Sequence, residues 1–124
     1  MGTVLVVDDS LEIRHIIRLA LARINILVID AHSAEQALDL ISESSPNAVI
    51  TDVHLPVMNG VELSEEIHKI DPNIPIIFMS GSTELMSSRE AAKTGKLLEK
   101  PFKLAQLQTL IQDTLSAQVG PHVY

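Results

Sequence analysis

The chain has 124 residues, of which 46% are hydrophobic and 20% charged, and its formal net charge is −7. These values are typical of one globular domain; they exclude a disordered chain, a membrane-spanning run of about 20 apolar residues, and nucleic-acid binding driven by positive charge. The sequence contains no cysteine, which excludes disulfides and thiol catalysis and favours a cytoplasmic location.

Short apolar runs alternate with amphipathic stretches along the whole chain. The runs predict strands at residues 4–7, 27–29, 48–51, 76–79 and 97–99. Apolar residues recur at helical spacing over 13–24, 34–41, 63–70 and 104–115, and a fifth, less apolar helix is expected at 84–94. This alternation of strands and helices predicts an α/β fold with one parallel sheet.

Turn-forming residues separate several of these elements. Residues 45–47 and 71–73 are expected to end helices. Asn59 and Gly60, in the turn after the third strand, tolerate a positive φ. The helix at 84–94 has little apolar surface to bury, so it should be the most mobile element, with Gly95 as its C-cap.

Chemically active side chains stand where four of the apolar runs end. These residues are Asp8, Asp9, Asp52, Ser80 and Lys100. In an open α/β sheet, ligands bind outside the carboxyl ends of the strands. We therefore expect three acids, one hydroxyl and one amine to converge on a single pocket.

The three acids indicate a metal site. Two unit charges about 4 Å apart repel by roughly 4 kcal/mol at an effective dielectric near 20, so the cluster needs a compensating charge. Ligands that are all oxygen favour Mg²⁺, or Mn²⁺, over zinc. Asp9 or Ser10 could instead cap the first helix, but capping accounts for only one of the acids.

The remaining groups favour phosphoryl transfer. Asp52 ends a buried strand and has no obvious capping role, so its carboxylate is a candidate nucleophile. A metal ion and Lys100 would neutralise the transferring oxygens, and Ser80 would donate a hydrogen bond to one of them. The bond between Lys100 and Pro101 can be cis or trans, which the sequence leaves open.

Four motifs, in their order along the chain, resemble the receiver (response-regulator, CheY-like) domain of two-component signalling. They are Val6-Val7-Asp8-Asp9, then Thr51-Asp52 followed by Leu55-Pro56 and Gly60, then Ser80-Gly81, then Lys100-Pro101-Phe102. The resemblance covers residues 4–115. It implies a doubly wound, flavodoxin-like fold with a five-stranded parallel sheet of order 2-1-3-4-5 and five flanking helices. We expect residues 1–118 to form this domain, 119–124 to form a short tail, and no output domain to follow.

The resemblance also implies a role for each matching position. Asp52 resembles the phosphoacceptor, Asp9 the direct Mg²⁺ ligand, and Asp8 a ligand that acts through water. The backbone carbonyl of His54 would be a further ligand. The His54 side chain is either an exposed loop residue or a group that tunes the lifetime of the phosphoryl group.

Ser80 and Lys100 match the family's hydroxyl residue and lysine, which act on the phosphoryl group. In this family a histidine kinase or phosphotransfer protein donates the phosphoryl group, with the first helix and the loop after Asp52 as the expected contact. The receiver catalyses only its own phosphorylation and dephosphorylation. The expected partners are therefore such a donor and an unidentified downstream protein, with no nucleic acid and no membrane, and the chain is expected to be a monomer or a weak dimer.

Two features depart from the family pattern. Leu97 stands where an aromatic residue is usual, and the stretch from Gly95 to Lys100 is two residues shorter than usual. Leu97 cannot reproduce the ring movement of typical members, and Phe78, the nearest aromatic residue, is expected in the core. Our hypothesis is that the output depends on the order of residues 84–94, or that the chain is a phosphate relay or sink.

Three other functions share parts of this pattern. An aspartate-nucleophile phosphatase usually carries a second acid two residues after the nucleophile, where this chain has His54. A flavodoxin-like cofactor binder needs a first loop that binds phosphate. The corresponding loop of this chain, residues 8–12, is acidic and would repel phosphate. A degenerate receiver would be an interaction module that never accepts phosphate.

Five of the nine basic residues lie close together in the sequence. They are Arg89, Lys93, Lys96, Lys100 and Lys103. This cluster is either a solvated helix face or a docking surface for an acidic partner.

Overall fold

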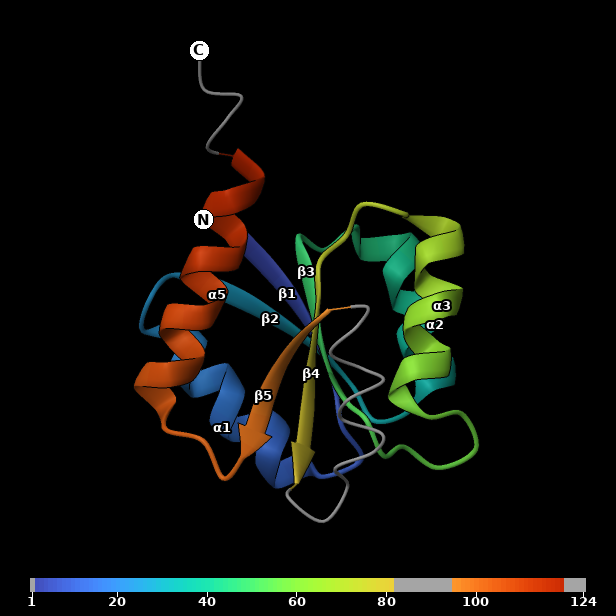
Figure 1. The fold of residues 1–124 in the computed structure, drawn as a ribbon, viewed down its shortest axis with the longest axis horizontal. Helices are drawn as coiled ribbons and strands as arrows, with labels where there is room; N and C mark the ends of the chain where they lie inside the picture. The colour runs from blue at the N-terminus through green and yellow to red at the C-terminus, as the bar shows by residue number, and fades with distance from the viewer. Residues whose placement is uncertain (1, 82–94, 120–124) are drawn as a thin grey trace.

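The computed structural model describes residues 2–81 and 95–119 of the chain. In this part, a five-stranded parallel sheet of order β2-β1-β3-β4-β5 carries helices on both faces, which confirms the predicted topology (Figure 1). In chain order, the elements are β1 (Gly2–Val7), α1 (Leu11–Ala22), β2 (Ile26–Ala31), α2 (Ala34–Ser44), β3 (Ala48–Asp52), α3 (Gly60–Ile70), β4 (Ile76–Gly81), β5 (Lys96–Lys100) and α5 (Leu104–Val119). The helix expected at 84–94 and the tail from residue 120 lie outside the described residues.

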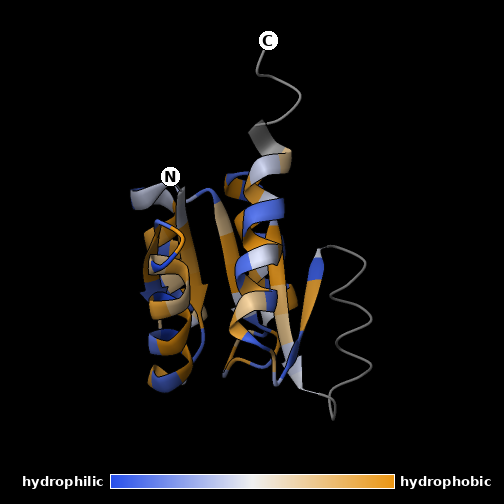
Figure 2. Ribbon diagram, turned by 90° about the vertical axis from the view of Figure 1, so that its left-hand side faces the viewer, coloured by the Kyte–Doolittle hydropathy of each residue, from blue (hydrophilic) through white to orange (hydrophobic). Residues whose placement is uncertain are grey.

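The central strands are buried on both faces. Leu5 and Phe78 belong to a core cluster with residues of α2 and α3, whereas Val6 and Ile50 belong to a second cluster with residues of α1 and α5. Figure 1 shows the two helix layers on either side of the sheet, and Figure 2 shows that the strands are apolar along most of their length. Because neither face of the central strands reaches solvent, their polar groups are confined to the strand ends.

A polar side chain caps the N-terminus of α1 and of α3, the helices that follow β1 and β3. The Ser10 hydroxyl accepts a hydrogen bond from the amide of Ile13 at 3.3 Å, so Ser10, and not Asp9, caps α1. Asn59 caps α3, where its side chain and that of Glu62 form a reciprocal capping box. Helix capping therefore does not explain Asp9.

No helix of the described residues has both the length and the apolar character that crossing a membrane requires.

The turn after β3 has its positive φ at neither Asn59 nor Gly60, the two residues that tolerate one. Asn59 has a φ of −74°, and no described glycine has a positive φ. The positive φ of this turn, 72°, falls on the exposed Val57. Gly60 is needed for space instead, because a Cβ there would lie 2.3 Å from the carbonyl oxygen of Asp52. The missing side chain lets α3 begin against the end of β3.

Candidate functional site

The carboxyl ends of the strands bring the predicted site residues to one edge of the sheet. Asp8 directly follows β1, and Asp52 and Lys100 are the last residues of β3 and β5. Ser80 lies near the end of β4. Asp8, Asp52 and Ser80 are buried, whereas Asp9 is exposed at the mouth of the site. The parallel arrangement thus places side chains from four strand ends on the same side.

The acids and the lysine form one cluster. One carboxylate oxygen from each of Asp8, Asp9 and Asp52 lies within 4.8 Å of the others. The Nζ atom of Lys100 donates to Asp8 Oδ2 at 3.3 Å and to Asp52 Oδ2 at 3.1 Å. When all the acids are ionised, three negative charges face one positive charge. The site therefore retains an excess of negative charge.

Burial and charge shift two protonation equilibria in the cluster. Burial raises the pKa of Asp8 above its ordinary value, and the charge of Asp52 adds to this, although the Ser10 amide and Lys100 act in the opposite direction. Burial alone would lower the pKa of Lys100, but attraction to Asp52 and Asp8 outweighs it and raises that pKa. Lys100 is therefore firmly protonated, and it is the cation that holds the two buried acids together.

The set of donor atoms fits a small, hard divalent cation. The three ligand groups are carboxylates, and Mg²⁺ prefers oxygen ligands while retaining several waters. Oxygens bound to an octahedral Mg²⁺ at about 2.1 Å lie at most about 4.2 Å apart. A separation of up to 4.8 Å accommodates the ion after a small closure, or with a water between the ion and one acid.

Ser80 and His54 flank Asp52 from two directions. Asp52 pairs in register with Met79, so Ser80 is one residue further along the neighbouring strand, and its hydroxyl donates to the carbonyl oxygen of Gly81 at 3.1 Å. The amide of His54 donates to Asp52 Oδ1 at 3.0 Å, while the His54 side chain is exposed. The peptide bond between Lys100 and Pro101 is cis.

Arg14 is a residue of the site region that the sequence did not indicate. Its Nη1 atom donates to the carbonyl oxygen of Asp8 at 2.7 Å, and its Nε atom donates to Asp30 Oδ2 at 2.9 Å. Burial acts to raise the pKa of Asp30, but Arg14 and Arg18 outweigh it and lower that pKa. The spacing of Arg14 and Arg18, four residues apart on a helix that otherwise packs on the sheet, was the available signal.

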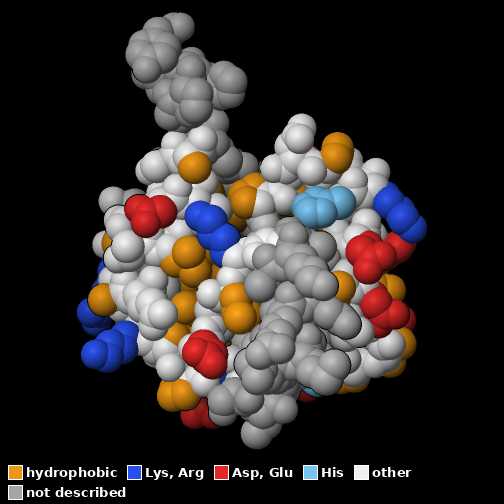
Figure 3. Space-filling view, viewed as in Figure 1, with side chains coloured by type: hydrophobic (Ala, Val, Ile, Leu, Met, Phe, Trp, Pro, Cys, Tyr) orange, Lys and Arg blue, Asp and Glu red, His pale blue; other side chains and the backbone are white. Residues whose placement is uncertain are grey.

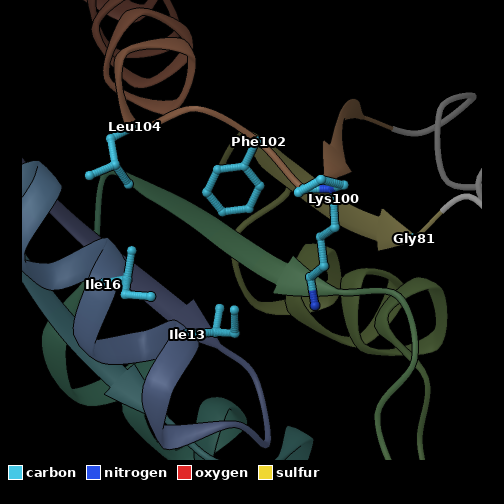
Figure 4. Close-up of a pocket in the computed structure, with 7 residues that line it drawn as sticks. Ile13, Ile16, Gly81, Lys100, Phe102 and Leu104 are labelled. Carbon is cyan, nitrogen blue, oxygen red and sulfur yellow. The ribbon is translucent and has the colours of Figure 1, made fainter.

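An apolar pocket of about 440 Å³ adjoins the acidic site. Figure 4 shows Ile13 and Ile16 on α1 facing Phe102 and Leu104, with Lys100 at one side. Two of these apolar side chains, Ile16 and Leu104, are partly exposed at 39% and 43%. The ammonium group that contacts the acids thus lies at the border of a surface suited to an apolar partner.

Leu97 and the short stretch that begins at Gly95, which depart from the family pattern, lie against β4. Phe78 is fully buried, which confirms its expected place in the core, and it pairs in register with the partly exposed Leu97. A Cβ on Gly95 would lie 2.4 Å from the carbonyl oxygen of Ile76 and 2.9 Å from the ring of Phe78. The short approach to β5 is therefore packed directly against β4, and it requires glycine there.

The described members of the basic cluster do not act as a group. Lys100 contacts the acids, and Lys96 donates to the hydroxyl of Thr114 at 3.1 Å. Arg89 and Lys93 lie outside the described residues. On the face drawn in Figure 3, acidic and basic side chains of the described residues are interspersed. The described part of this face therefore favours a solvated surface over a basic docking patch.

Comparison with known proteins gives the family. The sequence profile described as "Response regulator receiver domain" matches residues 4–112. The chain is 34% identical over 122 residues to the DNA-binding transcriptional regulator NtrC of Azospirillum brasilense, covering 97% of this chain and 25% of that protein. It is also 30% identical over 118 residues to the autoinducer 1 sensor kinase/phosphatase LuxN of Vibrio harveyi, covering 92% of this chain and 14% of that protein. The chain thus spans a quarter or less of the length of these relatives.

Solved structures agree with this result. A response regulator receiver domain protein from Clostridium thermocellum has a TM-score of 0.88 at 29% identity, covering 95% of this chain and 97% of that chain. The receiver domain of NtrX from Brucella abortus has a TM-score of 0.85 at 30% identity, covering 91% of this chain and 98% of that chain. With the sheet order, the motifs at the strand ends and the profile match in agreement, this chain belongs to the response regulator receiver domain family of two-component signalling.

Proposed function

We propose that this receiver accepts a phosphoryl group on Asp52, with Mg²⁺, from a histidine kinase or a histidine phosphotransfer protein. The observation that carries the proposal is the bridge from Lys100 to both Asp8 and Asp52 within the three-acid cluster. A merely structural ion pair needs one acid, whereas this site holds three acids around one lysine. The surplus negative charge matches a divalent cation and the charge-neutralising demands of phosphoryl transfer.

In the proposed reaction the Asp52 carboxylate attacks the phosphorus of a phosphohistidine donor. The O–P bond to Asp52 forms as the N–P bond breaks, and the electron pair of the broken bond returns to the imidazole nitrogen of the donor. The Lys100 ammonium and the Ser80 hydroxyl donate hydrogen bonds to the phosphoryl oxygens, and the His54 amide orients Asp52. Mg²⁺, held by Asp8, Asp9, Asp52 and the carbonyl of His54, would supply positive charge to the same oxygens.

The apolar pocket beside Lys100 supports a helical phosphodonor domain as the partner. Its walls come from α1 and from the segment that joins β5 to α5, and the exposed Leu11 extends the apolar surface along α1. An amphipathic helix of the donor that packs there would bring its histidine to the edge where Asp52 lies. Output through residues 84–94 and action as a phosphate relay or sink are further proposals.

The deciding experiment is intact mass spectrometry after incubation with Mg²⁺ and acetyl phosphate or phosphoramidate. We expect the mass of one phosphoryl group to be gained by the wild type and lost in Asp52→Asn. Asp39→Asn, which neutralises an exposed acid on α2, is the matched control and should still gain it. An adduct that persists in Asp52→Asn would contradict Asp52 as the acceptor, and no adduct on the wild type with any donor would favour the degenerate receiver.

Thermal melting tests the metal separately from the phosphoryl group. A ligand that binds only the folded state stabilises it by about 1.4 kcal/mol at ten times its Kd, so millimolar Mg²⁺ should raise the melting midpoint. The rise should be smaller in Asp9→Asn, because this variant removes one ligand without disturbing the buried Lys100 contacts. A midpoint that does not respond to Mg²⁺ would contradict the metal assignment.

A further inference from the structure

The loop that carries Asp8 and Asp9 is fixed at its backbone as well as at its side chains. The amide of Asp8 donates to the carbonyl oxygen of Ala31 at 3.1 Å, and the amide of Ser10 donates to Asp8 Oδ1 at 2.8 Å. The carbonyl oxygen of Asp8 accepts from Arg14 Nη1 at 2.7 Å. Both backbone groups of Asp8 are thus held, and among the described residues it is the Arg14 side chain that contacts the carbonyl oxygen of Asp8.

Arg14 is itself held in place by Asp30 on β2. The Nε atom of Arg14 donates to Asp30 Oδ2 at 2.9 Å, and the Arg14 side chain is only 11% exposed. A guanidinium presents several N–H groups in a rigid plane, so one side chain can hold a carboxylate and a carbonyl at the same time. Asp30 therefore orients the guanidinium of Arg14, and that guanidinium in turn holds the carbonyl group of Asp8.

Arg18 provides a comparison within the same protein. It also binds Asp30, with Nη2 and Oδ1 2.5 Å apart, but its Nη1 atom donates to the carbonyl oxygen of Val28 and not to Asp8. Both arginines lie on α1, carry the same charge and bind Asp30. They differ in their hydrogen bond to a backbone carbonyl, which in Arg14 goes to Asp8 and in Arg18 goes to Val28.

We infer that Arg14, oriented by Asp30, is a positioning residue for the metal site and holds the Asp8–Asp9 loop in the geometry that Mg²⁺ requires. The inference rests on the proposed function, because it assumes that these acids bind the ion. Charge alone gives the opposite expectation, since removing a nearby cation should tighten the binding of Mg²⁺. A loss of affinity in the Arg14 variant would therefore report positioning and not electrostatics.

The test is a Mg²⁺ titration of the purified protein, followed by the ¹⁵N NMR shifts of the site amides and by calorimetry. Groups that orient metal ligands typically contribute about 10–100-fold to metal affinity, and we expect Arg14→Ala to weaken binding by at least about tenfold. Arg18→Ala should keep the Kd within about twofold, because the second hydrogen bond of Arg18 goes to Val28 and Arg14 keeps its own hydrogen bond to Asp30 Oδ2. The free energy of unfolding without Mg²⁺ is measured for each variant.

Arg14→Lys keeps the positive charge for Asp30 but replaces the planar fork with a single nitrogen. We expect it to keep most of the stability while still weakening Mg²⁺ binding, and it provides the same test if the alanine variant does not fold. Wild-type affinity in either Arg14 variant, or an equal loss in Arg18→Ala, overturns the inference while leaving the proposed function intact. If the wild type itself does not bind Mg²⁺, the proposed metal site fails and the inference fails with it.

Discussion

Val57 offers a direct test of backbone strain in the loop that follows Asp52. It has a φ of 72°, in the left-handed region, and it is β-branched, a type of residue for which this conformation is an outlier. Its relative exposure is 101%, so no packing of its side chain offsets the cost. Substitution by glycine therefore removes strain without creating a cavity.

The magnitude follows from two opposing contributions. The left-handed conformation costs an L-residue with a Cβ about 1–2 kcal/mol, and glycine avoids this cost. Glycine also gives the unfolded chain more conformational freedom, which costs about 0.4–1 kcal/mol of stability. We expect Val57→Gly to raise the free energy of unfolding by about 0.5–1 kcal/mol and the melting midpoint by about 2–5 °C.

Urea denaturation with two controls makes the measurement specific. Asn25 also has a positive φ, 62°, but asparagine tolerates this conformation, so Asn25→Gly should change stability little. Val57→Ala keeps a Cβ without the branch and should recover only part of the gain. The reasoning is refuted if Val57→Gly is no more stable than the wild type, or if Asn25→Gly gains as much.

Two further predictions concern residues that support the site. The lowered pKa of Asp30 means that its contribution to stability is present above its ordinary pKa of 3.8 and is lost as the pH falls through the lower folded value. Asp30→Asn should therefore flatten the stability curve below about pH 4, measured by urea denaturation across acid pH. Gly60→Ala places a Cβ 2.3 Å from the Asp52 carbonyl oxygen and should cost about 1–3 kcal/mol in the same assay. In Gly2→Ala the close contact, at 2.8 Å, is with the flexible side chain of Leu115, so this variant should cost clearly less.

Much of the fold was predictable because the central strands are buried on both faces. Such strands read as continuous apolar runs, and β1, β3 and β4 each contain the predicted run. The runs underestimate the strand ends, since Ser80 and Gly81 continue the β4 ladder opposite Glu99 and Lys100. Polar residues at a strand end carry no apolar signal, although the backbone pairing extends over them.

The residues of the candidate site could be predicted from the sequence, but the contacts that hold them in place could not. A strand end places a side chain by topology alone, which is why Asp8, Asp52 and Lys100 could be expected to meet. The contact from Arg14 to Asp8 depends on how α1 packs against the loop, which no local pattern encodes. The positive φ at Val57 could not be expected either, because Asn59 and Gly60 are the residues of that turn with the stronger local preference.

The double contact of Lys100 also has a consequence for how the protein folds. Lys100 lies 92 residues from Asp8 and 48 residues from Asp52 in the sequence. Contacts between such distant residues form more slowly than local contacts, because closing a longer loop costs more conformational entropy. During synthesis from the N-terminus, both acids emerge well before their cation, and only the pairing of β5 with β4 brings that cation to them. The cluster of acids and lysine is therefore completed only when β5 pairs with β4, so a chain in which this strand is unpaired lacks the proposed phosphoryl-transfer site.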